Sequence, residues 1–472
     1  MLKQTDIVSG LRELGLAKGD NVLIHSSLVA LGQVEGGASM VVDALLEAVG
    51  PEGLVVVPTF ACKPPFDRKV SATPLGAIPD RLWRRPNAVR SLHPTHSVAA
   101  IGKGAEELIK DHEKASTAYA EGTPYYNLAM MGGKVLLLGV DQDRNTTLHT
   151  AEALAGSPYL KDIRGTYVDD DGKEVTIPIA AMAGPHRDFI GLDRLFKEHG
   201  VMKVGKIGNA VCRLMDGKTM IETAVEAMRL DPAAVLCDNP ACADCIMQRG
   251  KIKAARLANE SFTLAAVAGD ISNEPGEILD AIRGEGISAL EITADEYRQF
   301  GDGLAESKVK IIAVRGHVGD RDSAELAEKL GVPLIVLVHT QEAFEEAARM
   351  GSVLIENDGA PSFLYAELYS KNPNAPKLAF NPGYFVTAGE KPFLEVFYRG
   401  TMRKQMAHFY IDDATFDGKS ALPGKGNGEV KEIISMLRCR SYGGVMTLRS
   451  RAAGVSNFRK MAKAFWRLLD NM

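Results

Sequence analysis

The feature that most constrains the fold is a series of eight short apolar segments in the second half of the chain. They occupy residues 262–267, 289–293, 309–314, 334–338, 352–356, 376–381, 407–411 and 445–449. Segments with helical spacing separate most of them, among them 275–283, 341–349 and 429–437. Parallel strands need long crossover connections, which helices commonly supply. Eight such units predict a compact TIM-type (β/α) barrel over 258–472.

Before residue 250 the alternation is less regular, and the predicted elements mix strands, helices and one hairpin. They are a helix at 6–16 with Thr5 as its N-cap, a strand at 21–24, a helix at 38–49, a strand at 54–58, and a hairpin over 165–179 that turns at 169–172. The mixture predicts an α/β domain over 1–250 with helices on the faces of a sheet. The boundary is expected near 250–258, where a basic stretch follows a cysteine cluster.

Charge and composition exclude several classes of protein. The chain has 472 residues, enough for two or three domains, and 55 Lys and Arg against 60 Asp and Glu give a net charge of −5. The chain has no basic excess that would suggest a nucleic-acid or membrane-surface partner. The apolar runs are too short to cross a bilayer, no signal peptide is apparent, and six cysteines do not make a disulfide scaffold. We therefore expect a cytoplasmic enzyme with a small-molecule substrate, either monomeric or homo-oligomeric.

One candidate binding segment, His25-Ser-Ser-Leu-Val-Ala-Leu-Gly-Gln-Val-Glu-Gly-Gly-Ala38, lies between a predicted strand and a predicted helix. Hydroxyl residues and glycines at such a turn leave backbone N–H groups free to bind a phosphate. A plain turn with an N-cap serine explains the same residues equally well. The segment is neither a Walker loop nor a Gly-x-Gly-x-x-Gly fingerprint, which disfavours a nucleotide hydrolase and a Rossmann oxidoreductase.

Two further segments concentrate residues that carry chemistry. Arg90-Ser-Leu-His-Pro-Thr-His-Ser97 holds two histidines, two serines and an arginine beside a turn made by proline. Asn145-Thr-Thr-Leu-His-Thr-Ala-Glu152 follows a buried strand, at the edge where open α/β sheets usually bind ligands. His149 and Glu152 share a face if Thr147 starts a helix, and a histidine suits deprotonating an amine. The alternative is a histidine that only caps the start of the helix.

Taken together, these segments resemble the aminoglycoside 3-N-acetyltransferase family. The resemblance rests on His-Ser-Ser-Leu near the N-terminus, Pro58-Thr-Phe60, Arg-Ser-x-His-Pro-x-His-Ser and Asn-Thr-Thr-Leu-His-x-x-Glu, in this order. It covers roughly residues 1–235 and implies an acetyl-CoA-dependent N-acetyltransferase whose fold is distinct from the GNAT fold. Acetyl-CoA would be the co-substrate and a small-molecule amine the acceptor.

The resemblance also implies roles for individual residues. His149 would be the general base that takes a proton from the accepting amine, and Glu152 would orient or polarise it. The residues implied on the coenzyme side, with the last two close to the thioester, are His25, Ser26, Ser27, Thr59, Ser91, Ser97, Asn145 and Thr146. The amine would attack the thioester directly, with backbone N–H groups stabilising the oxyanion and no acyl-enzyme. Cys62 is then expected to be a buried cysteine rather than a nucleophile.

The acceptor side departs from the family pattern. Members that modify aminoglycosides carry acidic residues late in the second strand of the hairpin, whereas residues 175–182 of this chain hold no carboxylate. The next polar residues are His186, Arg187 and Asp188, so positive charge is expected where the family has acid, and Asp188 is the acidic candidate for binding substrate. We therefore expect an amino sugar or another natural amine as acceptor. The alternatives are an antibiotic-resistance 3-N-acetyltransferase and a non-catalytic ligand-binding protein.

Three cysteines, Cys237, Cys242 and Cys245, fall close together near the expected domain boundary. Their thiolates could hold structural zinc or an iron–sulfur cluster if a fourth ligand came from elsewhere. The sequence offers neither a second C-x2-C pair nor a histidine nearby. A reduced interdomain turn is therefore favoured, with structural zinc as the alternative.

The second half resembles the xylose isomerase-like (sugar phosphate isomerase/epimerase) barrels. The resemblance rests on residues 355–357, 380–383, 408–419, 424–434 and 442–449. Such barrels bind a divalent metal through two glutamates, an aspartate and a histidine. Here Glu356 and His408 match, but Asn381 and Arg449 replace two of the acids, which should exclude the metal. The barrel would then be a binding or scaffolding module, with Arg449 either receiving an anionic ligand or pairing with Glu356.

Overall fold

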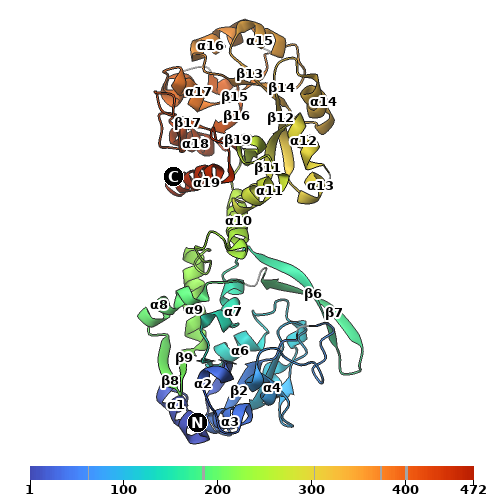
Figure 1. Ribbon diagram of the computed structural model, residues 1–472, viewed down its shortest axis with the longest axis vertical. Coiled ribbons are helices and arrows are strands. Elements are labelled where there is room, and N and C mark those ends of the chain that lie inside the picture. Colours follow the sequence, from blue (N-terminus) through green and yellow to red (C-terminus); the bar gives the residue numbers. More distant parts are fainter. Residues whose placement is uncertain (62, 183–185, 302, 373–374, 399–401) are drawn as a thin grey trace. The chain divides into compact units, whose positions relative to one another are not determined.

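The computed structural model divides the chain into two compact units, Met1–Gln248 and Arg249–Met472. It describes residues 1–61, 63–182, 186–301, 303–372, 375–398 and 402–472. The division falls within one helix, α10 (Ala243–Leu257) (Figure 1). No helix in the described part of the chain is both long and apolar enough to cross a membrane.

The first unit is built on a mixed sheet of seven strands in the order β3-β4-β2-β1-β5-β9-β8. The central strands β2, β1 and β5 are parallel, and the flanking strands are antiparallel to their neighbours. The strands are β1 (Asn21–Ser26), β2 (Leu54–Pro58), β3 (Val89–Arg90), β4 (Val98–Gly102), β5 (Lys134–Leu138), β8 (Met202–Ile207) and β9 (Ala210–Asp216). The parallel centre brings the carboxyl ends of three strands to one edge of the sheet.

Both faces of this sheet are covered, which explains why its central strands are largely apolar. Leu136 and Leu138 of β5 pack into the core on one face, while Val135 and Leu137 pack into the core on the other. The covering elements are α1 (Gln4–Leu14), α2 (Leu28–Leu31), α3 (Gly37–Val49), α4 (Ala77–Trp83), α5 (Ala105–Ile109), α6 (Pro124–Met130), α7 (Leu148–Leu154), α8 (Leu192–Glu198) and α9 (Gly217–Leu230), with short turns η1 (His112–Lys114), η2 (Gln142–Arg144) and η3 (Phe189–Gly191).

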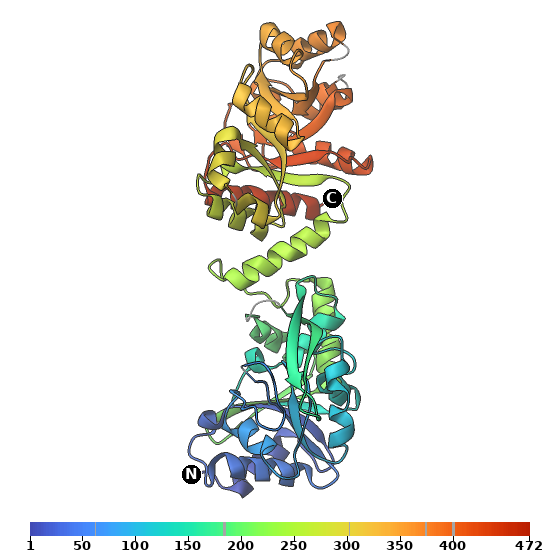
Figure 2. The ribbon, with the colours of Figure 1, turned by 90° about the vertical axis from the view of Figure 1, so that its right-hand side faces the viewer.

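The predicted hairpin forms a separate two-stranded sheet, β6 (Leu160–Val168) and β7 (Glu174–Met182) (Figures 1 and 2). The turn between them spans the predicted residues 169–172, so this expectation is confirmed. The predicted N-cap of the first helix is wrong. Helix α1 begins at Gln4, because the Asp6 carboxylate accepts the backbone N–H of Lys3 at 2.9 Å and thereby caps the chain before Thr5.

The second unit contains a closed barrel of eight parallel strands, in agreement with the eight predicted segments. They are β10 (Thr263–Val267), β11 (Ala289–Thr293), β12 (Lys310–Gly316), β13 (Leu334–Val338), β14 (Val353–Asn357), β15 (Lys377–Phe380), β16 (Met406–Ile411) and β19 (Val445–Leu448). A further pair, β17 (Asp413–Ala414) and β18 (Ser420–Ala421), forms a small antiparallel ladder.

Helices follow most of the barrel strands and bury their apolar faces against the barrel's outer surface. They are α11 (Pro275–Gly284), α12 (Ala294–Phe300), α13 (Gly303–Ser307), α14 (Arg321–Leu330), α15 (Gln341–Ala347), α16 (Ser362–Lys371), α17 (Pro382–Thr387), α18 (Val430–Cys439) and α19 (Val455–Asp470), with short turns η4 (Ala268–Asp270) and η6 (Met402–Lys404) and a π-helix η5 (Pro392–Tyr398).

Candidate active site

A cavity of about 500 Å³ opens at the carboxyl ends of β1, β2 and β5. Four of the residues predicted on the coenzyme side line it, namely His25, Ser26, Ser27 and Thr146. Pro58 and Arg144 contribute to the same wall. Parallel strands direct the loops that follow them to one edge of the sheet, which is where open α/β sheets commonly bind ligands.

Two polar atoms at the end of β1 have no hydrogen-bond partner in the described part of the chain. The Nε2 atom of His25 and the hydroxyl of Ser26 are buried, and neither has a hydrogen-bond partner among the described residues. Ser27 accepts the backbone N–H of Ala30 at 3.4 Å and is the N-cap of α2. The N-cap explanation of this segment therefore holds for Ser27, while His25 and Ser26 keep polar atoms that a ligand could satisfy.

A glycine permits the close approach that shapes this edge. Gly139, at the end of β5, has a φ of +72°, and a Cβ there would lie 2.6 Å from the Cβ of Ala30. A larger residue would push α2 away from the sheet. The absence of a side chain at Gly139 therefore allows the loop after β1 to lie close to the end of β5.

His149, Glu152 and Arg187 form a hydrogen-bonded line. Helix α7 begins at Leu148 with Thr147 as its N-cap, so the prediction that His149 and Glu152 share a helix face is confirmed. The Nδ1 atom of His149 lies 2.5 Å from Oε2 of Glu152, and Nε of Arg187 donates to Oε1 at 2.6 Å. The His149 side chain is 23% exposed, whereas that of Glu152 is 0% exposed.

Arg187 was expected to present positive charge to the acceptor, and the structure corrects that expectation. Its side chain is 2% exposed, pairs with Glu152 and lies over the ring of Tyr159 at 4.8 Å. Its charge is therefore balanced inside the protein rather than offered to a substrate. The sequence did not predict this ion pair, because its only signal was a basic residue in the segment that follows β7.

The neighbours of Glu152 determine the charge of its carboxyl group. Burial by itself would raise the pKa of Glu152, but the hydrogen bond from His149 and the charges of His149 and Arg187 outweigh it and lower the pKa. Glu152 is therefore ionised at neutral pH and accepts the proton of Nδ1. A neutral imidazole that donates its Nδ1 proton to this carboxylate carries its free lone pair on Nε2.

Aromatic rings and buried histidines surround His149. The rings of Tyr119 and Phe189 lie 4.9 and 5.1 Å from its imidazole, and Tyr119 bonds Nε2 of His96 at 2.9 Å. Burial lowers the pKa of His25 to about 3, with a smaller contribution from His149, and burial alone lowers that of His93 to about 4. Burial first, and neighbouring histidines second, also hold the pKa of His96 well below its usual range. These histidines are neutral at pH 7.

Thr59, Ser91 and Ser97, predicted on the coenzyme side, lie in a buried network instead of along the cavity wall. Thr59 accepts from Nε of Arg90 at 3.1 Å and bonds the hydroxyl of Ser97 at 3.2 Å, while Ser91 bonds Nδ1 of His112 at 2.9 Å. All three are at most 1% exposed. These contacts hold the loops after β2 and β3 together, and a direct role toward the coenzyme stays a prediction.

The side chain of Asn145 is also buried and hydrogen-bonded within the protein. Its amide donates to Oε1 of Gln142 at 2.9 Å, and the residue is 1% exposed. Its Oδ1 has no partner among the described residues. Asn145 thus fixes the turn that brings Thr146 to the cavity. Cys62, predicted to be buried, lies outside the described residues.

An acidic group lies near Asp188, the predicted substrate ligand. Asp188 is half-buried and its carboxylate accepts the backbone N–H of Gly191 at 3.3 Å, capping η3. The pKa of Asp143 is raised, first by partial burial and then by the carboxylates of Asp141 and Asp188. The carboxylates that affect one another near Asp188 therefore belong to the turn after β5, and not to β7. Sequence reasoning missed them, although Asp141 and Asp143 directly follow the buried strand.

The cysteine cluster has a histidine beside it. The sequence offered no neighbouring histidine, yet the structure brings Nδ1 of His186 to 3.4 Å from the sulfurs of both Cys242 and Cys245. Cys237 belongs to the same group. The expectation that no histidine completes the set is wrong, because the fourth residue, His186, comes from the segment that follows β7.

The barrel interior replaces the expected metal ligands with ion pairs. Arg449 lies with Nη1 3.4 Å from Oε1 of Glu356, and Asn381 donates to the same oxygen at 2.9 Å. His408 lies 2.9 Å from Glu291. The salt bridge weighed for Arg449 is thus present. Sequence reasoning missed Arg315, whose guanidinium lies 2.9 Å from Glu291 and 2.8 Å from Glu356 and bridges the two carboxylates.

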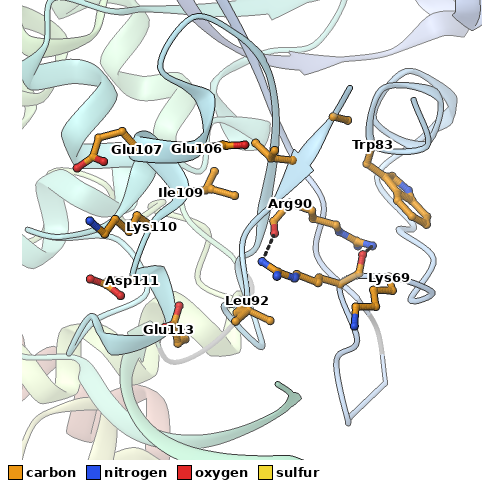
Figure 3. A pocket seen from close by; sticks show the side chains of 13 residues that line it. Lys69, Trp83, Arg90, Leu92, Glu106, Glu107, Ile109, Lys110, Asp111 and Glu113 are labelled. Carbon is orange, nitrogen blue, oxygen red and sulfur yellow. Dashed lines mark hydrogen bonds between the residues drawn. The ribbon is translucent and has the colours of Figure 1, made fainter. Parts of the chain in front are cut away.

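A second, larger cavity of about 820 Å³ lies elsewhere in the first unit. Arg90, Lys69 and Trp83 form one wall, and Glu106, Glu107 and other charged residues form the opposite wall (Figure 3). None of the residues predicted for catalysis or coenzyme binding is among the described residues that line it. The cavity beside His25 therefore remains the candidate active site.

Comparison with known proteins finds relatives of the first unit. The family model described as aminoglycoside 3-N-acetyltransferase matches residues 23–229. Aminoglycoside N(3)-acetyltransferase IV from Salmonella sp is 34% identical over 238 residues, covering 50% of this chain and 90% of the relative. Aminoglycoside N(3)-acetyltransferase VII from Streptomyces paromomycinus is 36% identical over 262 residues, covering 48% of this chain and 91% of the relative.

A solved structure is also similar to this chain. The crystal structure of aminoglycoside acetyltransferase AAC(3)-IVa, apoenzyme, has 33% identity and a TM-score of 0.47, covering 52% of this chain and 95% of that one. From the sequence relationships, the chain belongs through its N-terminal half to the aminoglycoside 3-N-acetyltransferase family and is an acyltransferase.

Proposed function

We propose that the first unit transfers the acetyl group of acetyl-CoA to an amine of an aminoglycoside or a related amino sugar. The observation that carries this proposal is the line His149–Glu152–Arg187, in which a partly exposed histidine contacts a buried, ionised carboxylate. Such a histidine is suited to remove a proton from a substrate amine. Relatives of this chain are named aminoglycoside N(3)-acetyltransferases, which supports the same acceptor class.

In the proposed reaction each residue of the line has one task. Acetyl-CoA supplies an activated thioester. Nε2 of His149 accepts a proton from the attacking amine, so that its nitrogen can form the new C–N bond as the C–S bond breaks. The carboxylate of Glu152 stabilises the imidazolium that results, and Arg187 holds that carboxylate in place. His149 can then pass this proton to the departing thiolate, so that the products are an amide and a free thiol.

The coenzyme side of the proposal rests on the cavity beside β1. His25 and Ser26 line this cavity together with Thr146, and each has a buried polar atom without a hydrogen-bond partner among the described residues. A ligand with phosphate and amide groups would satisfy such atoms. These residues therefore fit an acetyl-CoA site, with Asn145 holding the turn that carries Thr146.

The acceptor side of the proposal rests on charge. Aminoglycosides are polycations, and the carboxylates of Asp141, Asp143 and Asp188 are close enough to affect one another electrostatically. Arg187 does not oppose a cation, because Glu152 balances its charge. The positive charge of Arg187 therefore does not exclude an aminoglycoside. The two candidate acceptors are an aminoglycoside antibiotic and another amino sugar.

A thiol-release assay tests the proposal. Purified full-length protein is mixed with acetyl-CoA and a panel of aminoglycosides, amino sugars and simple diamines, and free thiol is followed together with product mass. We expect thiol release that depends on the amine and a product heavier by one acetyl group. Tight acetyl-CoA binding with no acetylated product from any amine would instead support a non-catalytic ligand-binding protein.

We further propose that residues 1–250 form the acetyltransferase domain and that residues 258–472 are a xylose isomerase-like barrel of the TIM type without a metal centre. The supporting observation is that Arg315 forms ion pairs with both Glu291 and Glu356. A guanidinium between two carboxylates satisfies them in place of a divalent cation. The barrel would then act as a binding or scaffolding module.

A further inference from the structure

Four side chains in the first unit meet with metal-ligand chemistry. They are His186 in the segment that follows β7, Cys237 and Cys242 in the loop after α9, and Cys245 in the first turn of α10. Their ligand atoms all lie within 4.8 Å of one another. The imidazole Nδ1 is 3.4 Å from the sulfurs of Cys242 and Cys245. Three segments of the chain thus converge on one point.

This geometry is close to that of a tetrahedral metal site. With Zn–S near 2.3 Å and Zn–N near 2.0 Å, tetrahedral angles place sulfurs about 3.8 Å apart and nitrogen about 3.5 Å from each sulfur. The two 3.4 Å contacts match the second distance, and the 4.8 Å limit requires only small side-chain adjustments. We propose that His186, Cys237, Cys242 and Cys245 bind one zinc ion.

The donor set favours zinc in a structural role. Three thiolates and one imidazole suit a tetrahedral zinc ion, whereas magnesium, calcium and manganese prefer oxygen ligands. Four protein ligands fill the coordination sphere and leave no position for a substrate. Binding converts each coordinating thiol into a thiolate and releases its proton, so zinc affinity falls as the pH falls.

The remaining described cysteines do not share this environment. Cys212 is buried in the apolar core of the sheet, and Cys439 is exposed in the second unit. His199 is exposed at the end of α8. These residues provide matched controls, because they have the same chemistry but lie outside the cluster.

The site would hold a segment that the active site uses. The residue after His186 is Arg187, which bonds Glu152 and also donates through Nη1 to the backbone oxygen of His186 at 2.7 Å. The backbone N–H of Asp188 donates to the carbonyl of Val235 at 2.9 Å. Zinc at the cluster therefore ties residues 186–188 to the loop after α9, and it acts as a positioning element for Arg187.

The decisive experiment measures metal content in the full-length protein. Protein expressed with added zinc and purified without chelator is analysed by inductively coupled plasma mass spectrometry, and we expect about one zinc per chain. The variants Cys242→Ser and His186→Ala should lose at least half of it, while Cys439→Ser and His199→Ala should retain it. Zinc below about one ion per five chains, iron in place of zinc, or full zinc in both cluster variants would overturn the proposal.

Two measurements on the unaltered protein keep the test valid if a variant fails to fold. Titration with a mercurial reagent should release zinc in proportion to the thiols that react. Replacement of zinc by Co²⁺ should produce a thiolate-to-cobalt charge-transfer band. Zinc that stays bound after the thiols are blocked, or cobalt bound without this band, would contradict cysteine ligation. Both readouts are independent of acetyl transfer, so their failure would leave the proposed activity untouched.

Discussion

The two carboxylate oxygens of Glu152 have different partners: Oε2 lies 2.5 Å from Nδ1 of His149, and Oε1 lies 2.6 Å from Nε of Arg187. Glu152 is fully buried, so the carboxylate has no bulk water to replace either partner. Its two oxygens thus contact an imidazole and a guanidinium, of which the guanidinium is always charged. This arrangement explains how a buried acid can be tolerated beside a base.

Replacing His149 with alanine should reduce acetyl transfer by about 10²–10⁴-fold, the usual effect of removing a general base. Acetyl-CoA binding should persist, because His149 is not among the residues that line the cavity beside β1. Thiol release reports the rate, and isothermal calorimetry reports the binding. The exposed His199→Ala serves as control. Near-normal turnover in His149→Ala would assign the base to another residue.

Breaking the buried pair of Glu152 and Arg187 should destabilise the first unit. Removing one partner of a buried ion pair typically costs about 3–5 kcal/mol, because the other charge is left unpaired. We expect Glu152→Gln and Arg187→Met each to lower the free energy of unfolding, and the double variant to lose less than the sum of the two. Urea unfolding gives these energies. Additive losses would show that the two side chains do not act as a pair.

The buried histidines should make the first unit sensitive to acid. Because burial lowers the pKa of His93 to about 4, the unfolded chain binds a proton below pH 6.5 that the folded chain does not. The contribution of this histidine to the free energy of unfolding is therefore fully present above pH 6.5. It falls by about 1.4 kcal/mol per pH unit as the pH decreases toward 4.

Urea unfolding between pH 7.5 and 4.5 checks this, with His93→Asn as the test variant. The variant should be less stable at neutral pH, because His93 is buried and accepts the backbone N–H of His96 at 3.0 Å. The gap between the two proteins should narrow as the pH falls, since only the unaltered chain has this histidine to titrate. A gap that stays constant with pH would refute the assignment, and His199→Asn should leave the profile unchanged.

In the barrel, Arg315 should decide whether a divalent cation can bind. Restoring acids with Asn381→Asp and Arg449→Glu should give no Mn²⁺ affinity on its own, because Arg315 still bridges Glu291 and Glu356. Adding Arg315→Ala should free both carboxylates and produce measurable Mn²⁺ binding by calorimetry. Stoichiometric Mn²⁺ at this site in the unaltered protein, or isomerisation of a sugar, would show that the barrel has a working metal centre.

Local pattern was enough to predict much of this protein. The eight barrel strands and the hairpin turn agree with the structure, because alternation and helical spacing are properties of consecutive residues. His149 and Glu152 share a face for the same reason, since they lie three residues apart in one helix. The motifs around them were likewise sufficient to indicate the family.

The partners of these motifs were decided only by the tertiary structure. Arg187 meets Glu152 from 35 residues away, His186 meets Cys242 from 56, and Arg315 meets Glu356 from 41. In sequence, Arg187 looked like exposed positive charge, and the cysteines looked one ligand short. Which side chains meet across such distances depends on strand register and on how loops cross the sheet edge, and neither is encoded in the spacing of neighbouring residues.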